Sequence, residues 1–215
     1  MDAILKSECK KKKFQSRRNL VWLENGYVIK RILPDKDKQN TIMLAEFEAN
    51  ILSLLYTAGV AVPKLISLEY DTLTMEYIDG ITLTDAILVY EQNNLPADKL
   101  VTPVIRWLKS FYEALPKGSI RGDVNCRNFI LTQSGQAVGV DFESIPVGNK
   151  ETDIGRLAAF ILTYEPPNTT YKEFLVNMML DEATIHLDTN HTLIKQAQEK
   201  ELEEINKRRK LLTKK

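Results

Sequence analysis

One stretch decides the fold of this chain: Ile120-Arg121-Gly122-Asp123-Val124-Asn125-Cys126-Arg127-Asn128-Phe129-Ile130-Leu131. Asp123 is followed five residues later by Asn128, and an apolar, β-prone run comes next. Such a loop lets the Asp123 carboxylate face an incoming hydroxyl, while the amide oxygen of Asn128 turns back toward a metal. Asp141 then ends a second apolar run, at a place where a carboxylate is costly without a partner.

These residue types predict a phosphate-transfer site. Asn128 and Asp141 supply the hard oxygen ligands that Mg²⁺ uses beside nucleotide phosphates. Asp123 would accept the proton of the attacking hydroxyl or orient the acceptor. Taken alone, Asp141 could equally cap a turn.

Composition indicates an ordinary globular protein. The 215 residues are 44% hydrophobic and 27% charged, and 29 basic residues balance 29 acidic ones. Because the charges balance, the protein has no overall electrostatic field that would attract it to nucleic acid or to a membrane. The two cysteines lack metal-ligand spacing and favour a reducing compartment. Because the N-terminus is too polar for a signal peptide and no apolar run approaches the ~20 residues of a membrane span, we expect a cytoplasmic protein.

The first third of the chain predicts a small antiparallel sheet with one helix. Asn25-Gly26 is a tight hairpin signal between two apolar runs. The helix is predicted over 41–58, where Leu44, Phe47, Ile51, Leu54 and Leu55 recur at helical spacing. Strands are predicted at 4–9, 18–23, 27–33, 65–69 and 72–77, with 10–16 as a loop.

The remainder is predicted to be mainly helical, which makes the fold class α+β. Helices are predicted at 98–115, 151–164, 171–180 and 193–212, and short strands at 129–132 and 137–141. We expect two lobes, residues 1–78 and 79–215, with a hinge at 77–83. Asp123, Asn128 and Asp141, which predict the phosphate-transfer site, all lie in the second.

This order of motifs resembles the protein-kinase-like superfamily, whose pattern is H-x-D-x-x-x-x-N followed by D-F-G. The chain has Arg121-Gly122-Asp123 to Asn128, then Asp141-Phe142-Glu143. The resemblance runs over about two thirds of the chain, and it implies an active site built from Asp123, Asn128, Asp141 and Lys30.

The resemblance also implies roles for residues on both sides. Tyr27-Val28-Ile29-Lys30 matches the strand lysine that binds phosphates, and Glu48 on the next helix would pair with Lys30. Backbone groups of Glu76 and Ile78 would bond adenine in the segment between the lobes. Asp153 resembles the buried aspartate that holds the catalytic loop through backbone hydrogen bonds.

Several departures from the pattern matter. The glycine-rich loop is missing, and residues 10–16 stand in its place. Their lysines and Ser16 would meet phosphate by charge and hydroxyl, or they form a solvated charge run. Glu143 replaces glycine, as in choline kinases and some aminoglycoside phosphotransferases, and could contact the metal directly or through its ligands. The short spacing from Asp141 to Asp153 resembles RIO kinases, the KEOPS-complex kinase and small-molecule kinases, and the segments 58–64 and 75–80 look most like the first two.

The resemblance therefore implies an enzyme that uses ATP and Mg²⁺ to move the γ-phosphate to a hydroxyl, as an atypical Ser/Thr protein kinase. A kinase of small alcohols, amino-alcohols or sugars and a pseudokinase scaffold are the alternatives. The basic tail 207–215 is either a helix end whose charges complement the helix dipole, or a docking site for RNA or a partner protein. The acceptor and the oligomeric state stay open.

Overall fold

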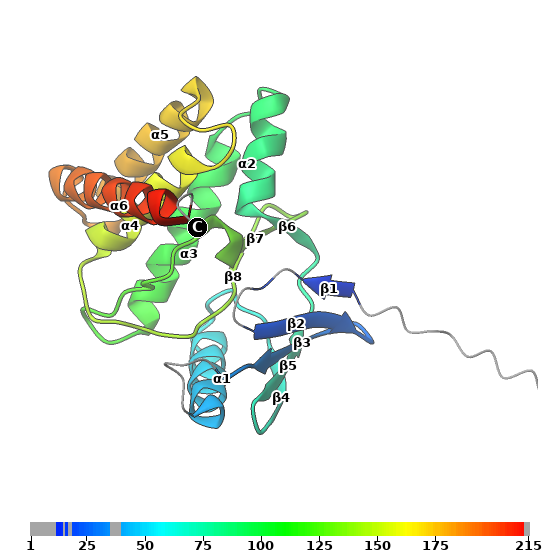
Figure 1. Cartoon of the computed structure of the whole chain (residues 1–215). Helices are drawn as coiled ribbons and strands as arrows, with labels where there is room; N and C mark the ends of the chain where they lie inside the picture. The colour runs from blue at the N-terminus through cyan, green and yellow to red at the C-terminus, as the bar shows by residue number, and fades with distance from the viewer. Residues whose placement is uncertain (1–11, 15, 17–18, 35–39, 213–215) are drawn as a thin grey trace, which may run out of the picture.

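The computed structural model describes residues 12–14, 16, 19–34 and 40–212. It is an α+β fold, with an antiparallel sheet toward the N-terminus and a mostly helical part after it, as predicted (Figure 1). The strands are β1 (Lys12–Phe14), β2 (Asn19–Glu24), β3 (Tyr27–Ile32), β4 (Leu65–Glu69), β5 (Thr72–Glu76), β6 (Gly80–Thr82), β7 (Phe129–Thr132) and β8 (Ala137–Gly139). The helices are α1 (Thr41–Thr57), α2 (Leu83–Gln92), α3 (Asp98–Ala114), α4 (Lys150–Thr163), α5 (Thr170–Leu187) and α6 (His191–Leu212), with a 3-10 turn, η1 (Cys126–Asn128).

The first sheet has the strand order β1-β2-β3-β5-β4, and its neighbours are antiparallel. The predicted hairpin between β2 and β3 is confirmed, since Asn25 and Gly26 have φ values of 53° and 81° at its turn. The second hairpin, β4–β5, turns at Tyr70 with a φ of 53°. A separate small sheet, β6-β7-β8, lies on the helical side and carries the catalytic loop into β7.

Two segments differ from the prediction, and a third cannot be compared with it. The loop expected over 10–16 is wrong for Lys12–Phe14, which form β1 because the open edge of β2 offers them backbone partners. The strand predicted at 4–9 lies outside the described residues. The predicted hinge 77–83 contains β6, and the unpredicted helix α2 follows it directly, capped by the Thr82 side chain. None of the described helices is both long and apolar enough to cross a membrane.

Helix α1 is present where predicted, and its inward face is only partly the predicted apolar stripe. Leu55 is buried and Leu44 and Ile51 are half-buried against the core, whereas Phe47 and Leu54 are exposed. The buried residues are Ala45, Glu48, Ala49, Leu52 and Leu55. Glu48 points inward and pairs with Lys30, so a carboxylate occupies part of the inward face.

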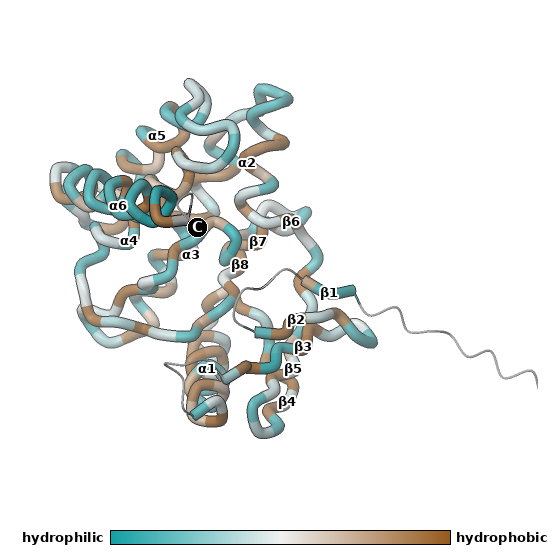
Figure 2. The backbone as a smooth tube through the Cα atoms, in the orientation of Figure 1, coloured by the Kyte–Doolittle hydropathy of each residue, from teal (hydrophilic) through white to brown (hydrophobic). Residues whose placement is uncertain are grey.

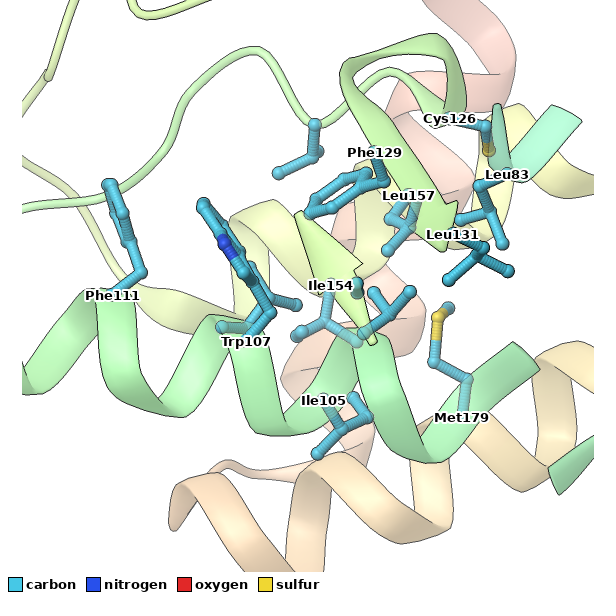
Figure 3. Packing of buried hydrophobic residues seen from close by; sticks show 14 of the residues in the cluster. Leu83, Ile105, Trp107, Phe111, Cys126, Phe129, Leu131, Ile154, Leu157 and Met179 are labelled. Atoms are coloured by element: carbon cyan, nitrogen blue, oxygen red, sulfur yellow. The ribbon is translucent and has the colours of Figure 1, made fainter. Parts of the chain in front are cut away.

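An aromatic cluster forms the centre of the helical part (Figure 3). Trp107 of α3 stacks on Phe111 at 5.2 Å between ring centroids and meets Phe129 edge-on at 5.3 Å. The same Trp107 donates its Nε1–H to the Ala61 carbonyl at 2.7 Å, and the Gly139 amide donates to that carbonyl at 3.1 Å. Ala61 lies between α1 and β4, so one carbonyl joins the sheet side to both α3 and β8.

β8 passes over the Trp107 ring at Gly139. The ring lies so close to the backbone there that no side chain fits. A Cβ atom there would lie 2.6 Å from Cε2 and 2.8 Å from Cη2 of Trp107. Because that ring is fixed by its aromatic neighbours, Gly139→Ala should lower the free energy of unfolding by about 1–3 kcal/mol.

Urea denaturation followed by circular dichroism measures this loss. Gln133→Ala, an exposed change in the neighbouring turn, is the control and should stay within about 0.5 kcal/mol of wild type. Equal stability of the Gly139→Ala variant and wild type would contradict the packing described here.

Candidate active site

Lys30, Glu48 and Asp141 come from three distant parts of the sequence and meet at one point. Lys30 lies on β3, Glu48 on α1, and Asp141 two residues after β8. The Lys30 Nζ atom donates to Glu48 at 2.7 and 2.9 Å and also to Asp141 Oδ1. The structure therefore contains the pair of Lys30 and Glu48. Lys30 has Asp141, the carboxylate predicted to bind the metal, as a second partner.

Burial controls the charges of this trio. The side chains of Lys30 and Glu48 are 6% and 1% exposed, whereas that of Asp141 is 40% exposed. Burial would lower the pKa of Lys30, but the Glu48 and Asp141 carboxylates outweigh it and raise that pKa above its ordinary value. Burial raises the pKa of the Glu48 carboxyl, and Lys30 opposes the rise. Lys30 is thus a protonated cation, and Asp141 is the more exposed of the two carboxylates that accept its hydrogen bonds.

The backbone at Asp141 is held in an uncommon conformation. Its φ is 69°, a left-handed value that few non-glycine residues adopt. The Arg121 guanidinium donates to the carbonyls of Val140 and Asp141 at 2.6 and 2.5 Å and lies 4.3 Å over the Phe142 ring. The Phe142 amide in turn donates to Glu48 at 3.1 Å. Arg121, which replaces the usual histidine, therefore fixes the turn that presents the Asp141 carboxylate.

Arg121 is itself buried among acidic side chains. Burial lowers its pKa, and four surrounding carboxylates raise it: Asp141, Asp123, Asp153 and Glu48. Such a buried cation keeps several carboxylates close together in a small volume, which their mutual repulsion would otherwise oppose.

The catalytic loop presents Asp123 to solvent and holds Asn128 inside. Asp123 is exposed, and its Oδ1 accepts the Asn125 amide at 3.3 Å. The buried Asn128 donates its Nδ2 to the Asp123 carbonyl at 3.3 Å, while its own carbonyl accepts the Val140 amide at 2.9 Å. This last bond ties the loop to the chain segment that leads into Asp141.

Asp153, on the first turn of α4, holds the loop from below, as expected. Its carboxylate is fully buried and accepts the amides of Arg121 at 2.6 Å and Gly122 at 2.9 Å. Tyr112 adds a hydroxyl donor at 3.0 Å. Burial raises the pKa of Asp153 above its ordinary value, although these donors favour the carboxylate.

The chemistry of Asn128 and Asp141 fits Mg²⁺. Because the amide nitrogen of Asn128 donates to Asp123, its amide oxygen is the atom suited to a cation. Asp141 adds a partly exposed carboxylate. Among the described residues, no group of three or more His, Cys, Asp and Glu side chains is arranged to hold a metal. One carboxylate and one amide still suit Mg²⁺ where substrate phosphates supply further oxygens.

Glu143 and Ser16 lie on the side of the site nearest β2. Glu143 accepts the Asn19 side-chain amide at 2.6 Å and lies 3.8 Å from Lys30 Nζ. Ser16 Oγ accepts the backbone N–H of Asn19 at 3.2 Å. Asn19, which the sequence does not single out, thus links Ser16 to the Glu143 carboxylate, which lies near Lys30.

The two residues predicted to bind adenine lie at the end of β5 and just beyond it. The Glu76 amide donates to the Lys64 carbonyl at 2.9 Å, and its side chain accepts the Lys64 amide at 3.2 Å. Ile78 is half-buried in the short irregular segment before β6. Of the Glu76 backbone groups, its carbonyl is therefore the one suited to a base.

Other residues of the site carry no motif. Arg121 and Arg156 donate to backbone carbonyls. Tyr164 donates to the Asn125 amide oxygen, and Asn19 donates to the Glu143 carboxylate. Only Arg121 gave a signal in the sequence, by standing where a histidine is usual.

A lysine on a strand, a glutamate on the next helix, the loop from Asp123 to Asn128 and then Asp141 follow one another in this order on an α+β fold. This order is that of the protein-kinase-like superfamily. The family model of the RIO domain matches residues 7–150, which is more than half of the chain. The chain belongs to the RIO family of atypical protein kinases. A comparison with curated proteins gave no match.

Asp153→Ala should destabilise the protein. The change leaves the amides of Arg121 and Gly122 and the Tyr112 hydroxyl without their acceptor in a buried place, at a cost of about 2–4 kcal/mol. Chemical denaturation measures this cost. Asp181→Ala, an exposed aspartate on α5, is the control and should change stability by less than about 0.5 kcal/mol. A loss no larger than the control's would show that the loop does not depend on Asp153.

Proposed function

We propose that this protein transfers the γ-phosphate of ATP to a Ser or Thr hydroxyl of a protein, in a reaction that depends on Mg²⁺. RIO family membership supports a kinase that binds ATP. The observation that carries the proposal is the meeting of Lys30, Glu48 and Asp141, because a buried lysine beside a partly exposed carboxylate can hold a charged phosphate chain.

Each residue has a distinct part in the proposed reaction. Lys30, kept protonated and oriented by Glu48, would bind the α- and β-phosphates. Asp123, exposed at the loop, would accept the acceptor hydroxyl's proton or orient that hydroxyl for in-line attack. Asn128 and Asp141 would hold Mg²⁺, with Glu143 contacting it directly or through its ligands. When bound, Mg²⁺ neutralises negative charge on the phosphate oxygens.

The nucleotide would bind between two lobes, residues 1–78 and 79–215. Strand pairing supports this division, because β5 ends at Glu76 in the first sheet and β6 begins at Gly80 in the second. The carbonyl of Glu76 and the backbone of Ile78 would bond adenine, and Ser16 would lie toward the phosphates. A cytoplasmic location and a partner protein or RNA at the basic end of α6 remain predictions from composition.

Asp123→Ala should stop phosphate transfer and leave ATP binding intact. Loss of a general base lowers kcat by about 10²–10⁴-fold, and Asp123 makes no bond to Lys30. Incubation with γ-labelled ATP, with the protein itself and a mixed protein substrate as acceptors, measures transfer. The Asp181→Ala variant is the control and should transfer at the wild-type rate. Absence of transfer by the wild-type protein, despite ATP binding, would favour a pseudokinase and contradict the proposal.

Asp141→Asn should abolish the contribution of Mg²⁺ to ATP binding. The fold should persist, because Glu48 still pairs with Lys30. Thermal shift measures this: Mg²⁺-ATP at about 100 times its Kd should raise the wild-type Tm by about 5–10 °C. The variant should respond to ATP equally with and without Mg²⁺.

Glu143→Gln tests whether Glu143 contributes to Mg²⁺ binding. If Glu143 contacts Mg²⁺, half-maximal transfer will need several-fold more Mg²⁺ than wild type. An unchanged Mg²⁺ dependence would remove Glu143 from the proposed ligand set.

A further inference from the structure

Besides Asp153, two side chains hold the catalytic loop, one on each side of Asp123, and we call these contacts the first and the second anchor. On one side, Arg156 of α4 donates its Nη1 to the Gly122 carbonyl at 3.2 Å. On the other, the Tyr164 hydroxyl donates to Asn125 Oδ1 at 2.7 Å. The same Asn125 oxygen accepts a hydrogen bond from the Arg127 backbone amide at 3.0 Å. The Tyr164 hydroxyl therefore helps to hold a side chain that in turn holds the loop backbone.

Both anchors are connected to the last helix, α6. The Arg156 guanidinium lies 3.5 Å from Glu201 Oε2, and Arg208 donates to Glu201 Oε1 at 2.6 Å. Arg209 of the same helix donates to the Thr163 carbonyl at 2.6 Å, and Thr163 directly precedes Tyr164. Two consecutive arginines near the end of α6 thus support the two anchors separately.

Close packing makes α6 a rigid support for these contacts. A Cβ atom on Gly155 of α4 would lie 2.6 Å from the Gln198 amide nitrogen and 2.7 Å from the Ile194 carbonyl oxygen. Only glycine allows the two backbones to approach this closely. Figure 2 shows that α6 is hydrophilic over much of its length, and its buried residues are Ile194, Glu201 and Ile205.

The Glu201 carboxylate is the centre of the first anchor. It is 9% exposed as a residue and lies between two guanidinium groups, Arg156 and Arg208. Arg208 makes a charge-assisted hydrogen bond to it, which is stronger than a neutral one, and Arg156 forms an ion pair with it. Glu201 therefore keeps the Arg156 guanidinium aimed at the loop.

From this geometry we propose that α6, which lies beyond the matched RIO domain, positions the Asp123 carboxylate for transfer, with Glu201 and Tyr164 as positioning residues. The inference rests on the proposed role of Asp123. Asp123 is exposed, so its placement depends on the residues beside it in the loop. Reactions that need an aligned acceptor lose rate steeply when a catalytic group is displaced by about 1 Å.

Tyr164→Phe tests the second anchor, because it removes the hydroxyl and keeps the ring. We expect kcat to fall by about tenfold while KM for ATP stays within about twofold of wild type. Tyr171→Phe is the matched control, since it removes a hydroxyl that donates to the Leu95 carbonyl at 3.1 Å, away from the loop. It should leave kcat unchanged.

Glu201→Gln tests the first anchor, with Glu204→Gln as its control. Glu204 lies on the same helix and pairs with Lys207 at the surface. Glu201→Gln should lower kcat and leave KM for ATP unchanged, whereas Glu204→Gln should change neither. An equal fall in kcat for test and control variants, or a fall that follows a loss of Tm, would overturn the positioning role.

Amide hydrogen exchange of residues 122–127 gives a readout that needs no activity. Tyr164→Phe should speed exchange at the Arg127 amide, whose acceptor Asn125 loses its support, and Tyr171→Phe should not. If wild type transfers no phosphate but this exchange pattern appears, the proposed function fails and the support of the loop by α6 holds. If the exchange is unchanged in both anchor variants, the inference is wrong whatever the activity.

Discussion

The structure depends on one buried ammonium group. Lys30 is almost fully covered, and its charge is tolerated there because Glu48 and Asp141 accept its hydrogen bonds. Those partners belong to β3, to α1 and to the segment after β8, so the ion pairs bring together elements from both halves of the chain. Removal of either carboxylate would leave an incompletely compensated charge in a region of low dielectric constant. The same interaction therefore maintains the fold and arranges the site.

The orientation of α1 agrees with this constraint, which explains why the helix was predicted correctly but its buried face only in part. Helical spacing of Phe47 and Leu54 indicates a stripe that should pack inward. In the structure Glu48 takes the inward place, and those two side chains are exposed. A hydrophobic pattern carries no information about a carboxylate that must be buried to meet a distant lysine. Sequence periodicity is reliable for an element's existence and less so for its rotation where a functional group is involved.

The site was predictable where its residues form a spaced motif. Asp123, Asn128 and Asp141 follow one another at distances that indicate a loop and a strand end, and Lys30 follows a clear hairpin signal. Arg156, Tyr164 and Asn19 were not predictable as parts of it, because each donates to a backbone carbonyl, a side-chain amide or a carboxylate more than 30 residues away. A carbonyl acceptor leaves no mark in the sequence, since every residue has one. β1 was missed for a related reason, since its pairing depends on the open edge of β2.

The Ala61 carbonyl accepts hydrogen bonds from the Trp107 side chain and the Gly139 amide, and so joins the sheet side to the helical side. Two donors from different elements converge on one oxygen, so a sliding movement of one half past the other would break both bonds at once. A small rotation about that oxygen would preserve them. A rotation of the sheet side against the helical side therefore keeps both bonds only where its axis passes near Ala61.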